Sequence, residues 1–162
     1  MTRVDPAARH RAREAALQML YQSEIGRAGA YETITTFWPA NDPDGEIDEE
    51  QRGFANGLVR QTLERVQDLD RRLSEHAHNW RVERMAVIDR LVLRLAACEL
   101  MTQTDTPPKV IINEALELAR TFSSEESVPF VNGVLDALRK DVEQERAAAA
   151  PGPSDMARNE SE

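Results

Sequence analysis

The sequence predicts an all-α fold in which about seven helices form two small bundles that pack together. The 162 residues include only 7 glycines and 5% aromatic residues, and alternating runs of β-branched residues are scarce, which disfavours a β fold. Apolar residues instead recur at helical spacing along most of the chain. The balance of 41% hydrophobic and 30% charged residues is typical of a globular helical protein with a large surface.

The first predicted helix has a recognisable start and end. Asp5 can cap it, and Pro6 suits the first helical position because no N–H is needed there. Gly26 and Gly29 end the helical pattern. The helical spacing predicts a buried stripe of Ala12, Ala15, Ala16, Met19 and Leu20.

A short helix over residues 31–38 and a longer helical segment over residues 48–78 complete the first half of the chain. Between them, the stretch "PANDPDGE" predicts a loop, with Pro39 and Gly45 among its helix breakers. The apolar side of the longer segment consists of Phe54, Leu58, Val66, Leu69 and Leu73.

The next predicted helix, over residues 82–103, is apolar on most sides, which predicts a central place in its bundle. The apolar run is interrupted by Asp89, Arg90, Arg94 and Glu99, so it does not qualify as a membrane span. We therefore expect no membrane partner.

Two further helices follow. One covers residues 107–122, and its predicted buried positions are Ile111, Ala115, Leu118, Ala119 and Phe122. The polar turn "SSEES" separates it from the last helix, whose buried stripe is predicted to be Val131, Val134, Leu135 and Leu138.

These elements predict three parts of the chain. Residues 1–80 form an N-terminal helical subdomain with the basic first helix, and residues 81–146 form a C-terminal helical subdomain. The stretch "HNWRVE" predicts the junction between them. Residues 147–162 carry Pro, Gly and Ser without large apolar periodicity, which predicts a disordered tail.

The residues do not combine into a recognisable active site. The single cysteine, Cys98, falls in the most apolar helix, which predicts an inert core thiol and leaves no cysteine-based metal cluster. His76 and His78 are two positions apart, so on a helix their rings point in different directions. No glycine-rich phosphate loop is present. We expect no enzyme, no cofactor and no metal.

The N-terminus lacks the continuous apolar stretch of a secretory signal. One unpaired cysteine suits a reducing compartment. We therefore expect a cytoplasmic protein.

Positive charge gathers in the stretch "ARHRAREAAL", residues 8–17. Residues 1–13 contain four arginines and one aspartate, a net charge of +3. Because the whole chain carries −9, the other 149 residues carry −12. Cations oppose the helix dipole in a first turn, and each costs about 0.3–1 kcal/mol. One interpretation is a set of solvated arginines. The other is anion binding, since a helix N-terminus with guanidinium groups makes a phosphate site.

The arginines are predicted to fan out. At about 100° per residue, Arg9 and Arg13 lie about 40° apart and Arg11 points elsewhere. A fan suits an RNA backbone draped across the helix end better than one enclosed phosphate. Phe130 and Asn132 in "SVPFVNG" are candidates for contacts with bases. The alternatives are a core aromatic and an ordinary first-turn residue.

Four stretches, "ARHRAREAALQMLYQ", "RLVLRLAACEL", "PPKVIINEALELARTFSSEES" and "FVNGVLDAL", resemble the NusB family of bacterial transcription antitermination factors. They occur in the family's order and near its spacing, from about Ala7 to Lys140. The resemblance implies an all-α, non-enzymatic protein with two helical subdomains. It also implies binding of boxA RNA, a short single-stranded element of ribosomal-operon leaders. The implied partners are the small-subunit ribosomal protein that acts as NusE and the transcription elongation complex.

The resemblance also implies which residues touch RNA. The family's arginine-rich helix start implies phosphate contacts at Arg9, His10, Arg11 and Arg13, and its K-V-x-I-N-E-A segment adds a backbone contact at Lys109. Its F-V-N-G segment implies base-proximal contacts at Phe130, Asn132 and Gly133. NusE is expected on the helices over residues 82–103 and 107–122.

One rival interpretation remains, a helical protein–protein interaction module without RNA binding. The oligomeric state is open as well, because members of the family are seen as monomers and as homodimers. A measurement of RNA binding distinguishes the antitermination factor from the interaction module.

Overall fold

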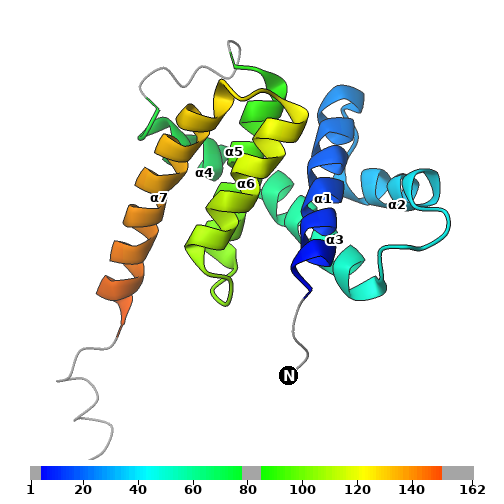
Figure 1. Ribbon diagram of the computed structural model, residues 1–162, viewed down its shortest axis with the longest axis horizontal. Coiled ribbons are helices and arrows are strands. Elements are labelled where there is room, and N and C mark those ends of the chain that lie inside the picture. Colours follow the sequence, from blue (N-terminus) through cyan, green and yellow to red (C-terminus); the bar gives the residue numbers. More distant parts are fainter. Residues whose placement is uncertain (1–4, 78–84, 151–162) are drawn as a thin grey trace, which may run out of the picture.

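The computed structural model describes residues 5–77 and 85–150, and in these residues every regular element is a helix (Figure 1). In this described part the seven helices are α1 (Pro6–Gly26), α2 (Ala30–Asn41), α3 (Glu49–Glu64), α4 (Val66–Ser74), α5 (Val87–Thr102), α6 (Pro108–Phe122) and α7 (Ser127–Ala149). The predicted all-α class is confirmed.

Helix α1 begins where its sequence predicts. The Asp5 carboxylate accepts a hydrogen bond from the Ala7 N–H at 3.0 Å, and Pro6 is the first helical residue. The whole predicted stripe is buried. The helix ends at Gly26, but Arg27 is the residue that takes the left-handed cap conformation, with φ 51°. Its N–H donates to the Ser23 carbonyl, which closes the last turn.

Helix α2 is longer than predicted, because Pro39 lies inside it and does not end it. A proline in the last turn removes only one backbone donor. The turn still closes, since the Asp42 N–H donates to the Trp38 carbonyl at 2.9 Å. The Asn41 side-chain amide also donates to the Phe37 carbonyl at 2.8 Å. The loop therefore begins at Asp42.

The segment predicted as one helix over residues 48–78 is two helices. Arg65 breaks it with φ −111° and ψ 13°, and its N–H is shared between the carbonyls of Gln61 and Thr62. The break redirects α4, which packs against α5 and α7. The end of the predicted segment at His78 and the junction "HNWRVE" lie outside the described residues.

Helix α5 is the centre of the molecule, as predicted. It contacts α1, α3, α4, α6 and α7, and every residue from Arg90 to Leu100 is buried. Helices α1, α2 and α3 pack together on one side of it, and α6 and α7 on the other (Figure 1). The division of the chain near residue 80 stays a prediction, since residues 78–84 are not described.

The charged residues that interrupt the apolar stretch of α5 serve as links to its neighbours. Arg94 donates two hydrogen bonds to Asp70 on α4, at 2.8 and 2.7 Å. Arg90 donates to Glu24 on α1 at 2.8 Å. Buried charges are tolerated when they are paired in this way. Among the described helices, none has the length and apolar character needed to cross a membrane.

Helix α7 carries its predicted buried stripe. It continues to Ala149, so residues 147–149, expected in the tail, are helical. Residues 151–162 lie outside the described part.

Candidate nucleic-acid interface

Arg9 and Arg13 lie on the same side of α1, as their spacing predicts, and both approach the ring of Phe54 on α3. The Cζ atom of Arg9 is 3.8 Å from the ring centroid and that of Arg13 is 5.5 Å away. Both distances are within cation–π range. Burial, and next the Arg13 cation, lower the pKa of Arg9, but a guanidinium stays protonated in a protein. Arg9 is thus a cation held at a half-buried position.

Arg13 does not lie on the surface, which corrects the expectation that it contacts phosphate there. Its side chain is 4% exposed, and that of Glu99 on α5 is 2% exposed. The Nε atom of Arg13 lies 3.0 Å from each carboxylate oxygen of Glu99, and Nη2 lies 2.5 Å from Oε1. The physical reason is the acidic partner on α5, which neutralises the guanidinium within the protein.

His10 bridges α1 and α6. Its Nε2 atom lies 2.9 Å from a carboxylate oxygen of Glu14, and its Nδ1 atom contacts the carboxylate of Glu114 on α6. Burial alone would lower the pKa of His10, but the hydrogen bonds and charges of Glu114 and Glu14 outweigh it, so the pKa is raised. Glu114 on α6 thus pairs with a residue of another helix, α1. Glu117, also on α6, instead pairs within the helix with Arg120, at 2.6 Å.

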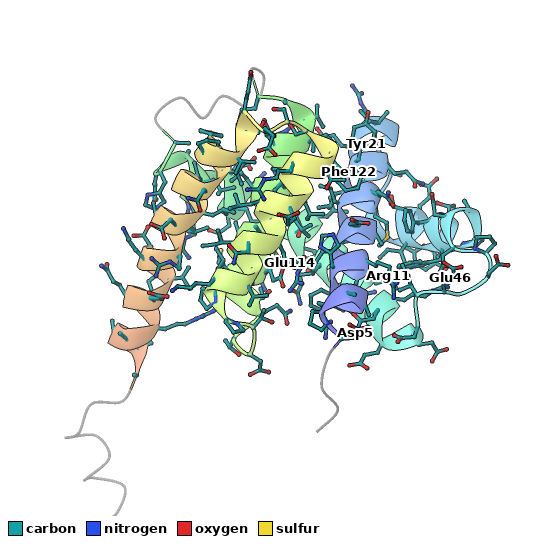
Figure 2. All side chains as sticks on the ribbon, viewed as in Figure 1. Asp5, Arg11, Tyr21, Glu46, Glu114 and Phe122 are labelled. Carbon is teal, nitrogen blue, oxygen red and sulfur yellow. The ribbon has the colours of Figure 1, made fainter. Side chains whose placement is uncertain are left out.

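Arg11 is exposed, and no ion pair engages it among the residues that the structure describes. Figure 2 labels Arg11 and Glu114 on opposite sides of α1. The predicted fan is therefore present. Arg11 points to one side, and Arg9 lies with the buried Arg13 on another.

Lys109 and Asn132 come together at a shallow hollow of about 210 Å³ between α6 and α7. Two of its other lining residues, Asn113 and Arg139, are not predicted from the sequence. Asn113 belongs to the N-E-A motif, and Arg139 lies seven positions after Asn132, two helical turns along the same face of α7. Arg139 donates hydrogen bonds to the carboxylates of Asp136 and Glu143, and these bonds raise its pKa. The hollow combines two amides and two cations with the carboxylate of Asp136, which pairs with Arg139 at 2.8 Å.

Phe130 is 43% exposed, so the alternative of a core aromatic is excluded. Asn132 and Gly133 are exposed as well, and a Cβ atom placed on Gly133 would meet open space. The first turn of α7 lies at the upper end of the molecule and the first turn of α1 at the lower end (Figure 1). Phe130 is therefore separated from the arginines of α1.

A cleft of larger volume lies where α1 begins. We call it the α1–α6 cleft, and its volume is about 460 Å³. Its lining residues come from α1, α3, α6 and the loop between α5 and α6, and they are Pro6, Arg9, Arg13, Phe54, Gln103, Asp105, Thr106, Pro107, Val110 and Glu114. Helical spacing predicts Phe54 on an apolar helix face, and only the packing of α3 against α1 brings it to the arginines.

Two side-chain groups outside this region have structural explanations. Burial raises the pKa of the Cys98 thiol, which suits the predicted core thiol. His76 lies with Glu75 and Asp141, a set that could hold a metal ion. Its Nε2 atom is 2.5 Å from a carboxylate oxygen of Asp141, a hydrogen-bond contact between the segment that follows α4 and helix α7. His78 is not described.

The fold and its exposed cationic helix start define a small all-helical binding protein. The sequence model of the NusB family matches residues 10–140, which is most of the chain. The chain belongs to the NusB family. As a member of this family it is a non-enzymatic protein.

Individual relatives agree with this assignment. The transcription antitermination protein NusB of Koribacter versatilis is 44% identical over 138 residues, which cover 85% of this chain and 92% of the relative. That of Solibacter usitatus is 44% identical over 144 residues, covering 89% and 97%.

Solved structures show the same fold. NusB of T. maritima superposes with a TM-score of 0.72 at 33% identity, covering 82% of this chain and 90% of that one. A chain from a crystal structure of the antitermination factors NusB and NusE with double-stranded RNA gives a TM-score of 0.72 at 23% identity. It covers 83% of this chain and 98% of that one.

Proposed function

We propose that this protein is a transcription antitermination factor that binds boxA single-stranded RNA together with a ribosomal protein acting as NusE. What supports the proposal is family membership combined with the exposed cations at the start of α1. A chain of the same fold was crystallised with NusE and double-stranded RNA, which supports NusE and RNA as the two partner classes. As an antitermination factor, the protein would act in the cytoplasm within a transcription elongation complex.

The RNA backbone would follow the surface from α1 over α6 to α7. Arg11 and Arg9 would contact phosphates at the start of α1, and Lys109 would add a cation at the start of α6. Asn132 and Arg139 would extend the surface at the hollow on α7. The strongly negative remainder of the chain would keep RNA away from other faces. Phe130 and Gly133 would serve a base at the far end of the strand.

The surface of this chain that would contact NusE can be limited to one of the two helices expected from the sequence. Helix α5 is buried from Arg90 to Leu100, so it offers little surface to a partner. We therefore assign the NusE contact to the exposed side of α6, where Glu117 and Arg120 form a surface pair. A homodimer that covers α1 would compete with RNA for the same arginines.

The test is fluorescence anisotropy of a boxA-type 12-mer with the protein and its NusE partner. The informative variant is the triple substitution Arg9→Ala, Arg11→Ala and Lys109→Ala, which leaves the buried Arg13 intact. The matched control is Arg60→Ala, an exposed helical arginine on α3. We expect the triple variant to lose at least tenfold in affinity, since three phosphate contacts are removed.

The rival function is a helical protein–protein module without RNA binding. It predicts that the wild type with its partner does not bind the 12-mer at any salt concentration. Equal affinity of the wild type and the triple variant would instead contradict the assigned surface.

A further inference from the structure

The α1–α6 cleft has the size of a ligand site. Its volume of about 460 Å³ falls within the roughly 300–1,000 Å³ typical of small-molecule sites. It lies beside Arg9 and His10, so an RNA strand on the start of α1 would pass its mouth. Sites of this kind combine apolar walls with a few polar groups that fix orientation.

The apolar walls offer flat and exposed surfaces. Phe54 lies under the Arg9 guanidinium at 3.8 Å, and Arg9 is itself partly exposed and lines the cleft, so its guanidinium plane can serve as a stacking surface. Pro107 and Val110 line the cleft from the loop and α6, and Val110 is 42% exposed. An exposed apolar side chain at the mouth of a cleft suits a ligand with a flat aromatic ring. Unpaired nucleobases are recognised in this way, on aromatic rings and on guanidinium planes.

A buried cation also lines this cleft. Arg13 is buried and lines the cleft. Glu99 accepts hydrogen bonds from Nε and Nη2 of Arg13. Within the described residues, no hydrogen bond engages the third nitrogen of Arg13, Nη1. The guanidinium of Arg13 therefore has N–H donors beyond those that Glu99 accepts, and these are open to an acceptor in the cleft. Arg9 supplies further donors beside it.

An acceptor comes from a different element. Asp105, in the loop between α5 and α6, lines the same cleft, and its exposed carboxylate has no ion pair among the described residues. Gln103 of the same loop adds an amide. The cleft thus offers guanidinium donors from α1 and a carboxylate acceptor from the loop.

We propose that the α1–α6 cleft binds a single unstacked guanine base of the RNA strand, an inference that rests on the proposed function. Guanine presents the O6 and N7 acceptors to guanidinium groups. On its other edge, N1–H and N2–H donate as a pair to one carboxylate. Adenine lacks the O6 acceptor, and uracil lacks a second adjacent donor. The donor and acceptor set of Arg9, Arg13 and Asp105 therefore matches guanine.

The experiment is a nuclear magnetic resonance titration of the methyl-labelled full chain with GMP, IMP and UMP. These nucleotides share ribose and phosphate, so differences report the base alone. The readout is the pair of Val110 methyl resonances, assigned with Val110→Ile. We expect GMP to shift them, IMP to bind roughly tenfold more weakly because it lacks the N2 amino group, and UMP to leave them unmoved.

The variant Asp105→Ala separates base recognition from simple charge. Removal of a negative charge near a nucleotide would strengthen binding of all three. Loss of the base contact would instead make GMP and IMP equal. Asp44→Ala, which removes an exposed aspartate from the α2–α3 loop, is the matched control and should keep the tenfold ratio.

Unmoved Val110 resonances, or equal shifts with all three nucleotides, would overturn the proposal. So would a GMP to IMP ratio that survives Asp105→Ala. Anisotropy with the boxA-type 12-mer distinguishes the two levels. RNA binding without a GMP effect leaves the proposed function standing and removes the guanine site. An effect of GMP without binding of the 12-mer would keep the guanine site and contradict the proposed function.

Discussion

Arg13 on α1 and Glu99 on α5 form a buried bidentate ion pair, with Nε 3.0 Å from both carboxylate oxygens. The pair joins the first helix to the central helix across a separation of 86 positions in the chain. It turns one residue of an arginine-rich segment into part of the protein interior. The neighbouring Arg9 and Arg11 keep their charges at or near the surface.

Breaking this pair on one side should destabilise the protein strongly. We expect Arg13→Met to lower the free energy of unfolding by about 3–5 kcal/mol, because Glu99 would remain as a buried, uncompensated charge. Urea denaturation followed by circular dichroism measures the change. The double variant Arg13→Met with Glu99→Leu is the control, and it should recover most of the loss. Wild-type stability of the single variant would contradict the buried pair.

Arg11 should act on RNA without acting on stability. It is exposed and no described residue forms an ion pair with it, so Arg11→Ala should change the unfolding free energy by less than about 0.5 kcal/mol. Its loss should reduce the slope of log affinity against log salt by about 1, since one phosphate contact is lost. Anisotropy at several salt concentrations measures the slope. Arg60→Ala, on α3, should leave the slope at its wild-type value.

The His10 bridge should make stability depend on pH. The carboxylates of Glu14 and Glu114 raise the pKa of His10 above its ordinary value of 6.5. A raised folded-state pKa means that the stabilisation is complete below about pH 6.5 and is lost as the pH rises through the folded-state value. The carboxylates must remain ionised, which sets a lower bound near pH 5.

The comparison that checks this is wild type against His10→Gln in urea denaturation between pH 5 and pH 9. The difference in unfolding free energy between wild type and His10→Gln should be largest near pH 5 and should shrink toward pH 9. A direct measurement is the titration of the His10 ring by nuclear magnetic resonance. A midpoint below 6.5 would contradict the bridge.

Cys98 should report opening of the core. It is the single cysteine of the chain, it is buried on α5, and burial raises the pKa of its thiol. A protonated and covered thiol is a poor nucleophile. We expect an aromatic disulfide reagent to leave the native protein unmodified and to react at once in urea. Rapid reaction under native conditions would contradict the packing of α5.

The helices and their buried stripes follow from local patterns in the sequence. Asp5 and Pro6 define the start of α1 through the hydrogen bonds of one turn, and the α7 stripe follows from apolar spacing. The misplaced boundaries have local causes that spacing does not reveal. Pro39 is tolerated because the last turn of α2 closes around it, and Arg65 breaks a segment whose apolar pattern continues.

By itself, the sequence determined the all-α class, the family and the gathering of cations at one helix start. Only the tertiary structure decided what each cation does. Helical spacing places Arg9 and Arg13 on one side of α1, but whether that side meets solvent or an acid depends on the packing of α5, which brings Glu99 to Arg13. The same packing brings Phe54 beneath Arg9. Contacts between distant segments depend on how whole helices pack, and no local pattern encodes them.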